Sequence, residues 1–298
     1  MKKIKLLLCS AGILLATQQD IAAQVLPDTT IANALLWQVS GNGLKDTSYL
    51  YGTMHLFCKE DIVLPEVLKE KILLSKKIFF ESSADKSDSS ENNWLRKKYF
   101  AYDYNIRDVI GDSNFIKASY IINNYRAIAI DTLKRMSMLG MQQLVTRSFL
   151  GCDRLEAFDY NILAFAIDNG KKIDGLETRR YESGQSPHFP GNILTRGITK
   201  TWNYQLANLW KIKRDIKLYK EQKINDIYLF STYKDNGEEA ATKEAVLDER
   251  NKEWIKAMKR AMKRNPCLFA FGCAHLAGPD GIIMLLRKKG YTVTPVFY

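Results

Sequence analysis

The chain has 298 residues, of which 46% are hydrophobic and 26% are charged, and its formal net charge at pH 7 is +11. This composition excludes a collagen-like, low-complexity or wholly disordered protein, and the length allows one large domain or at most two. The basic residues are spread along the chain without a nucleic-acid-binding signature. They indicate solubility and attraction to acidic surfaces rather than binding of nucleic acid.

The first 23 residues have the pattern of an export signal. Three lysines among the first five residues precede an apolar stretch from Leu6 to Ala16, and a polar segment then ends in Ile21-Ala22-Ala23. The apolar stretch is shorter than the ~20 residues that cross a bilayer. We therefore expect cleavage before Gln24 and a mature protein in the periplasm or outside the cell, with no stable membrane insertion. Its net charge would be +9, because three lysines and one aspartate leave with the signal.

The N-terminal part of the mature chain predicts a strand–helix–strand unit. Short strands are expected at 36–39 and 49–52, a helix begins at Pro65 and ends near residue 77, and a buried strand at 78–80 ends at Glu81. Because a helical crossover joins the strands at 49–52 and 78–80, these two should run parallel.

The rest of the chain predicts helices and a second unit of the same kind. A polar loop at 82–93 is followed by mostly helical sequence to residue 150, a helix at 159–169 and a strand at 173–176 that ends at Glu177. Helical and irregular sequence then leads to a long helix at 241–263, a strand at 268–271, a helix at 280–289 and a closing strand at 291–296.

We therefore expect an α/β fold with a central, mostly parallel sheet and two pseudo-symmetric strand–GxxH–helix–strand units. Residues 24–298 should form a single domain, with a large helical insertion at about 94–170 and 178–263. The methionines of the first insertion, at 136, 138 and 141, are expected to fill gaps in the core or line a groove.

Two of the three histidines share one sequence context. Tyr49 to Leu56 reads YLYGTMHL and Phe269 to Leu276 reads FAFGCAHL, so an apolar strand precedes Gly-x-x-His-Leu each time, with Gly52 and Gly272 allowing a sharp turn. Functional groups gather at the carboxyl ends of parallel strands. Two imidazoles, His55 and His275, with a carboxylate suit a divalent metal. The alternative is that both histidines only brace the sheet.

Glu81 and the pair Arg250-Asn251 are further candidates. Glu81 follows a buried strand, so it is a general base, a metal ligand or simply a carboxylate at the start of a loop. Arg250 and Asn251 fall on the apolar stripe of their helix, and a buried arginine needs an anionic partner. That partner could be Glu81, Glu177, Asp153 or a substrate carboxylate, in a structural salt bridge or a substrate contact.

Four cysteines remain in the mature chain: Cys58, Cys152, Cys267 and Cys273. They allow three full pairings, and the sequence does not choose among them. Cys58 lies three residues after His55, and Cys273 lies two before His275. One hypothesis is therefore a Cys58–Cys273 disulfide near the histidines, or a thiolate ligand there.

Four segments resemble the TraB/GumN (PrgY) family. They are Leu36 to Ser40 with Tyr49 to His55, Gly175-Leu176-Glu177-Thr178, Glu249-Arg250-Asn251, and Gly272-Cys273-Ala274-His275-Leu276 through to Val296. The resemblance implies an erythromycin-esterase/ChaN-like fold and kinship with the Tiki metalloproteases, which use two GxxH motifs and a glutamate with Mn²⁺ or Co²⁺. His55, Glu81 and His275 match those positions, and Asp153, Glu177, Arg250 and Asn251 match other recurrent ones.

Two functional hypotheses follow. The first is an exported metal-dependent hydrolase of peptides or proteins. A divalent Mn, Co or Zn ion is held by His55, His275 and Glu81, and Glu81, Arg250 and Asn251 act in catalysis. The second is a non-catalytic protein of the same fold that sequesters a peptide or holds haem. The sequence does not name the substrate, the metal or the oligomeric state, and the segment after Thr178 lacks the family's usual glutamine.

The export signal gives the first prediction. N-terminal sequencing of protein recovered from the cell envelope or medium should begin at or near Gln24, because Ala23 closes a recognisable cleavage site. Envelope protein that still begins with Met1 would contradict it.

Overall fold

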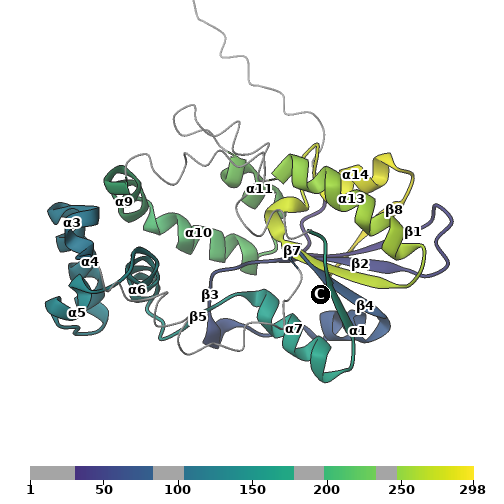
Figure 1. The fold of residues 1–298 in the computed structure, drawn as a ribbon. Helices are drawn as coiled ribbons and strands as arrows, with labels where there is room; N and C mark the ends of the chain where they lie inside the picture. Colours follow the sequence, from purple (N-terminus) through teal and green to yellow (C-terminus); the bar gives the residue numbers. More distant parts are fainter. Residues whose placement is uncertain (1–30, 83–103, 178–197, 233–246) are drawn as a thin grey trace, which may run out of the picture.

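The computed structural model describes residues 31–82, 104–177, 198–232 and 247–298 (Figure 1). The expected export signal and nearly all of the polar run at 82–93 lie outside these residues. None of the helices in the described part combines the length and the apolar character needed to cross a membrane.

A six-stranded sheet forms the centre of the protein. Its strands are β1 (Leu36–Ser40), β2 (Ser48–Thr53), β4 (Lys77–Phe80), β6 (Lys172–Gly175), β7 (Cys267–Gly272) and β8 (Thr292–Val296). The order is β6-β4-β7-β2-β1-β8, with parallel pairing from β6 to β2, and β1 antiparallel to both β2 and β8. The expected α/β fold with a mostly parallel sheet is confirmed.

Both strand–helix–strand units are present, but their strands interleave. The first unit runs β2–α1–β4 with α1 at Glu66–Leu74, and the second runs β7–α14–β8 with α14 at Ile282–Lys288. Strand β7 of the second unit lies between β2 and β4 of the first. It pairs in parallel with β2, and Thr53 is the partner of Gly272. The two GxxH segments therefore leave the sheet side by side.

Helices cover both faces of this sheet (Figure 1). On one face lie α11 (Ile224–Thr232), α13 (Glu249–Met262) and α14, and on the other lie α1 and α7 (Phe158–Asp168). Because both faces are covered, β7 is a continuous apolar run that is buried from Cys267 to Phe271. Apolar residues three and four apart on α13, such as Trp254 and Met258, pack onto this core.

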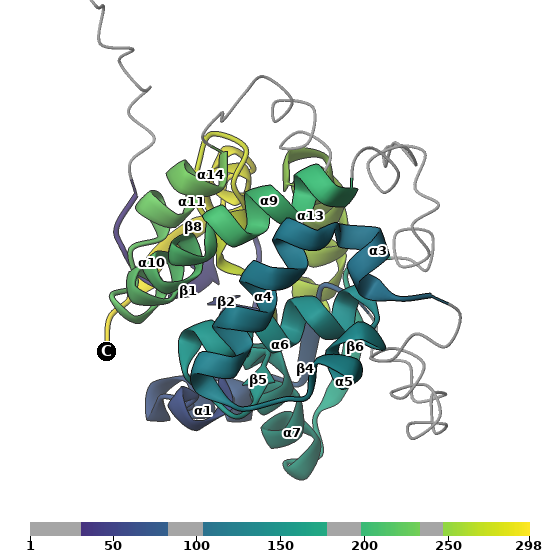
Figure 2. The ribbon, with the colours of Figure 1, turned by 90° about the vertical axis from the view of Figure 1, so that its left-hand side faces the viewer.

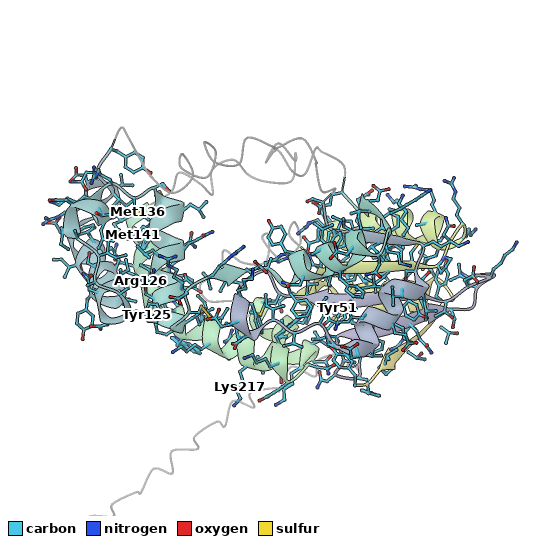
Figure 3. All side chains as sticks on the ribbon, turned by 90° about the horizontal axis from the view of Figure 1, so that it is seen from below. Tyr51, Tyr125, Arg126, Met136, Met141 and Lys217 are labelled. Atoms are coloured by element: carbon cyan, nitrogen blue, oxygen red, sulfur yellow. A yellow bond between two sulfur atoms is a disulfide. The ribbon has the colours of Figure 1, made fainter. Side chains whose placement is uncertain are left out.

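A second apolar core belongs to a helical region beside the sheet (Figures 1 and 2). Its helices are α3 (Ile106–Ile110), α4 (Asp112–Tyr125), α5 (Ile130–Lys134), α6 (Met138–Leu150) and α9 (Ile198–Ala207). Met136 and Met141 are buried in this core, in agreement with the sequence interpretation (Figure 3). Helix α10 (Leu209–Lys220) links the two regions, because Leu209 belongs to the second core and Leu218 to the first.

A disulfide joins Cys58 to Cys152, with Cα atoms 5.7 Å apart, beside a two-stranded ladder of β3 (Phe57–Cys58) and β5 (Leu155–Glu156). The hypothesis of a Cys58–Cys273 bond is therefore wrong. The reason is that β3 pairs with β5, whereas Cys273 is buried against Gly52. Cys267 and Cys273 are free, and burial raises the pKa of each thiol to about 12, so neither is suited to act as a thiolate ligand.

The disulfide gives a stability prediction. Cys58→Ser with Cys152→Ser should lower the free energy of unfolding by about 2–4 kcal/mol, because the bond closes a long loop in the unfolded chain. Denaturant unfolding measures this loss. A reductant should reproduce it in the wild type and have no effect on the double variant, and a peptide map that joins Cys58 to another cysteine would contradict the pairing.

Candidate functional site

Four predicted site residues lie at one edge of the sheet. His55, Glu81, Glu177 and His275 follow the carboxyl ends of β2, β4, β6 and β7, and these four strands are parallel neighbours. Parallel pairing brings strand ends that are far apart in sequence to the same edge. The expected gathering of these side chains is therefore present in the fold.

Glu81 is the centre of the group. Its Oε1 accepts a hydrogen bond from the backbone N–H of Gly272 at 2.8 Å, and it lies 3.4 Å from His55 Nε2 and 4.0 Å from His275 Nε2. Its Oε2 accepts a hydrogen bond from Arg250 Nη2 at 2.5 Å. One oxygen of Glu81 thus faces both imidazoles, while the other is paired with the guanidinium.

These contacts fix the charge of Glu81. Burial alone would raise its pKa, but several opposing effects outweigh burial; the hydrogen bond with His55 is the largest of them, and the charge of Arg250 and the N–H of Gly272 are among the others. Together they hold the pKa of Glu81 well below its usual range, so the side chain is an ionised carboxylate at neutral pH.

His275 is held rigidly and is neutral. It is 4% exposed, and its ring centre lies 4.4 Å from that of Trp254. Its Nδ1 is 2.7 Å from Asn251 Oδ1, and Asn251 Nδ2 donates to the carbonyl oxygen of Asp280 at 2.9 Å. Because that carbonyl can only accept, the amide orientation is fixed and Nδ1 of His275 carries the proton. Burial lowers the pKa of His275 to about 3, which leaves a lone pair on Nε2 facing Glu81.

His55 is the exposed member of the group, with 58% of its side chain accessible. Its Nδ1 lies 3.3 Å from Asp159 Oδ2, and Asp159 Oδ1 accepts a hydrogen bond from Thr53 Oγ1 at 2.8 Å. The hydrogen bond with Glu81 is the main reason why the pKa of His55 is raised, against the opposing effect of burial. Both histidines therefore have a polar partner at Nδ1 and direct Nε2 toward the same carboxylate oxygen.

Asp159 was not among the predicted site residues. Its only signal in the sequence is an acidic residue in the first turn of a helix, which helix N-termini favour without any function. Burial raises the pKa of Asp159. Its Oδ2 is buried and makes no hydrogen bond within the described residues, so it is suited to accept the Nδ1 proton of His55.

Arg250 joins two carboxylates. Its Nε donates to Glu177 and its Nη2 to Glu81, while the guanidinium lies 4.8 Å above the ring centre of Trp254. Burial raises the pKa of Glu177, although the charge of Arg250 opposes this shift. Of the partners considered for Arg250, the structure selects Glu81 and Glu177. Arg250 therefore orients Glu81, and Asn251 orients His275.

Asp153 does not join this group. It forms ion-pair and hydrogen-bond contacts with Arg126 and Tyr125 of the helical region. Figure 3 shows Tyr125 and Arg126 far from Tyr51 of β2, the strand that leads to His55. The candidate role of Asp153 at the sheet edge thus finds no support in its contacts.

The sequence model of the TraB/PrgY/gumN family matches residues 35–295, which include every residue of the site. The chain belongs to the TraB/PrgY/gumN family. No curated protein and no solved structure matches this chain.

The two GxxH glycines of this TraB/PrgY/gumN-family protein have different surroundings. A Cβ on Gly272 would lie 3.2 Å from Glu81 Oε1, 3.4 Å from His55 Nε2 and 3.7 Å from His275 Cδ2. A Cβ on Gly52 would instead lie 2.7 Å from Leu276 Cδ1 and 2.8 Å from the Cβ of Cys273. Gly272 therefore keeps the space between the polar groups clear, while Gly52 allows the close packing of β2 beneath them.

The donor types fit a divalent cation. Imidazole nitrogens and carboxylate oxygens are common ligands of Zn²⁺ and Mn²⁺, and the Nδ1 partners are the second-layer contacts that metal-binding histidines have. The three candidate ligand atoms, His55 Nε2, His275 Nε2 and Glu81 Oε1, are not all close enough to one another to surround an ion. In the described residues, the only three potential ligand atoms all within 4.8 Å of one another belong to Cys58, Glu60 and Cys152, two of which form the disulfide. Closure around an ion requires the exposed ring of His55 to move toward His275.

The two glycines give a matched pair of predictions. Gly272→Ala should keep the fold, because its backbone suits alanine, but should weaken divalent-cation binding about ten- to hundredfold by filling the space between the ligands. Gly52→Ala should lower the free energy of unfolding by about 1–3 kcal/mol through overpacking. Calorimetric titration with Mn²⁺ and thermal unfolding measure the two effects, and an exchange of the two phenotypes would contradict this assignment.

Proposed function

We propose that this protein is a metal-dependent hydrolase of peptides or proteins, with a divalent cation held by His55, His275 and Glu81. The observation that supports the proposal is the convergence of two Nε2 atoms on one ionised carboxylate oxygen, at distances of 3.4 and 4.0 Å. Neutral His275 directs the lone pair of its Nε2 at this carboxylate, which is unfavourable unless a positive charge lies between them. A divalent cation supplies that charge.

The proposed substrate class and the proposed cellular location of the protein are inferred from the sequence. The order of the two GxxH motifs and the intervening glutamate is similar to that of the Tiki metalloproteases, which cleave proteins. The N-terminal segment has the form of an export signal, so we place the activity in the periplasm or outside the cell. Mn²⁺, Co²⁺ and Zn²⁺ are the metals to test.

In this mechanism Glu81, Arg250 and Asn251 have separate roles. A bound divalent ion would supply Lewis acidity to a substrate carbonyl and to water. Glu81 presents Oε1 to the same space, where it would hold the cation or accept a proton from water. Arg250 and the N–H of Gly272 hold the Glu81 carboxylate, so Arg250 is a positioning residue here, as is Asn251 behind His275.

The histidines provide the direct test. His55→Ala and His275→Ala should each abolish metal binding and any peptide hydrolysis while leaving the circular dichroism spectrum unchanged. His188→Ala, which removes the third histidine of the chain, is the matched control and should retain both. Metal analysis after chelation and reloading, with a peptide-library digest, measures these effects.

Glu81→Gln separates the two roles of the carboxylate. Loss of hydrolysis with retained metal assigns Glu81 as the base, whereas loss of both assigns it as a ligand. Full activity in this variant would contradict either role. Tight binding of peptide or haem by the wild type, with no hydrolysis under any of the three metals, would favour the non-catalytic function instead.

A further inference from the structure

A basic groove lies beside α13, the helix that also carries two of the site residues. Helices α13 and α14 lie side by side on one face of the sheet (Figures 1 and 2), and a groove of about 600 Å³ runs between them. Six cationic side chains line it: Lys252, Lys256, Lys259, Arg260, Lys263 and Lys289. Its apolar part is formed by Ile255 and Leu285.

The charge of this groove is not balanced locally. No acidic side chain is among its lining residues, and of the six cations only Lys256 has an ion pair within the described residues, with Glu253 at 2.7 Å. Five of the six side chains are exposed, and Lys259 is half-buried. Like charges on one helix face repel one another, so an anionic partner would relieve this repulsion.

The shape of the groove narrows the choice of partner. The cations of α13 recur about once per turn from Lys252 to Lys263, over a length of about 16 Å. About five residues of an extended peptide have this length, and a single phosphate or lipid headgroup is shorter. A flat membrane does not enter a concave groove. A neutral sugar chain would use aromatic, amide or carboxylate groups, and none of these lines this groove.

We propose that the groove between α13 and α14 binds an acidic segment of a polypeptide. Several carboxylates of that segment pair with the lysines and Arg260, and an apolar side chain lies on Ile255 and Leu285. The site residues Arg250 and Asn251 do not line the groove and instead contact Glu81 and His275. The groove therefore binds its segment without metal, and the inference is independent of the proposed hydrolysis.

Fluorescence anisotropy with labelled peptides of about ten residues tests this proposal at near-physiological salt. The probe alternates glutamate and leucine, and two matched peptides replace either leucine with serine or glutamate with lysine. We expect the glutamate–leucine peptide to bind most tightly. We expect the glutamate–serine peptide to bind several-fold more weakly and the lysine–leucine peptide not to bind.

The variants locate the binding. Lys256→Glu with Arg260→Glu should weaken binding of the glutamate–leucine peptide about tenfold or more, since each reversal turns an attraction into a repulsion. Lys45→Glu with Lys117→Glu changes the net charge equally at exposed positions elsewhere and should change binding less than about twofold. If the groove variant is misfolded, Lys256→Gln with Arg260→Gln takes its place.

Three results would overturn the proposal. The first is equal weakening by both charge-reversal variants, which would indicate attraction by net charge alone. The second is equal affinity for the serine and leucine peptides, which would remove the apolar contact. The third is groove-dependent binding of phosphatidylglycerol vesicles without binding of the peptide, which would assign the groove to a lipid surface.

Discussion

The parallel pairing of β2 with β7 is the contact on which the rest of the site depends. It places Thr53 beside Gly272, so two GxxH segments from opposite ends of the chain leave the sheet as neighbours. The close approach needs a residue without a side chain at Gly52, where a Cβ would overlap Leu276 and Cys273. The same glycine in the second motif, Gly272, faces the polar groups instead. One repeated motif thus provides packing in its first copy and open space in its second.

The polar groups at this edge stabilise one another at a considerable cost in desolvation. Glu81 and Glu177 share the single guanidinium of Arg250, and Asp159 is balanced by Thr53 and His55. Buried ion pairs of this kind add little net stability compared with apolar residues of the same volume. Their effect here is geometric, because they hold the Glu81 carboxylate ionised with Oε1 toward both imidazoles. Under the proposed function, this geometry presents Oε1 of Glu81 to a ligand.

The sequence predicted the parts of this site that leave a local pattern. Apolar runs that end in His55, Glu81, Glu177 and His275 located the strand ends, and helical spacing located Arg250 on the inward face of α13. Strand order left no such pattern, so the position of β7 between β2 and β4 could not be predicted. The Cys58–Cys152 bond likewise follows from the pairing of β3 with β5, which are too short to show a period. Asp159 belongs to the site only through the packing of α7 below β2.

The two histidines are equivalent in sequence but not in their freedom to move. His275 is enclosed by Trp254 and fixed through Asn251, whereas His55 is mostly exposed and begins the segment that leads to Cys58. The disulfide to Cys152 limits how far that segment can travel. Under the proposed function, His275 and Glu81 would form the rigid half of a cation site, and the remaining adjustment would fall on His55. The cost of closing such a site would then lie in moving one tethered, solvent-exposed ring rather than in reorganising the core.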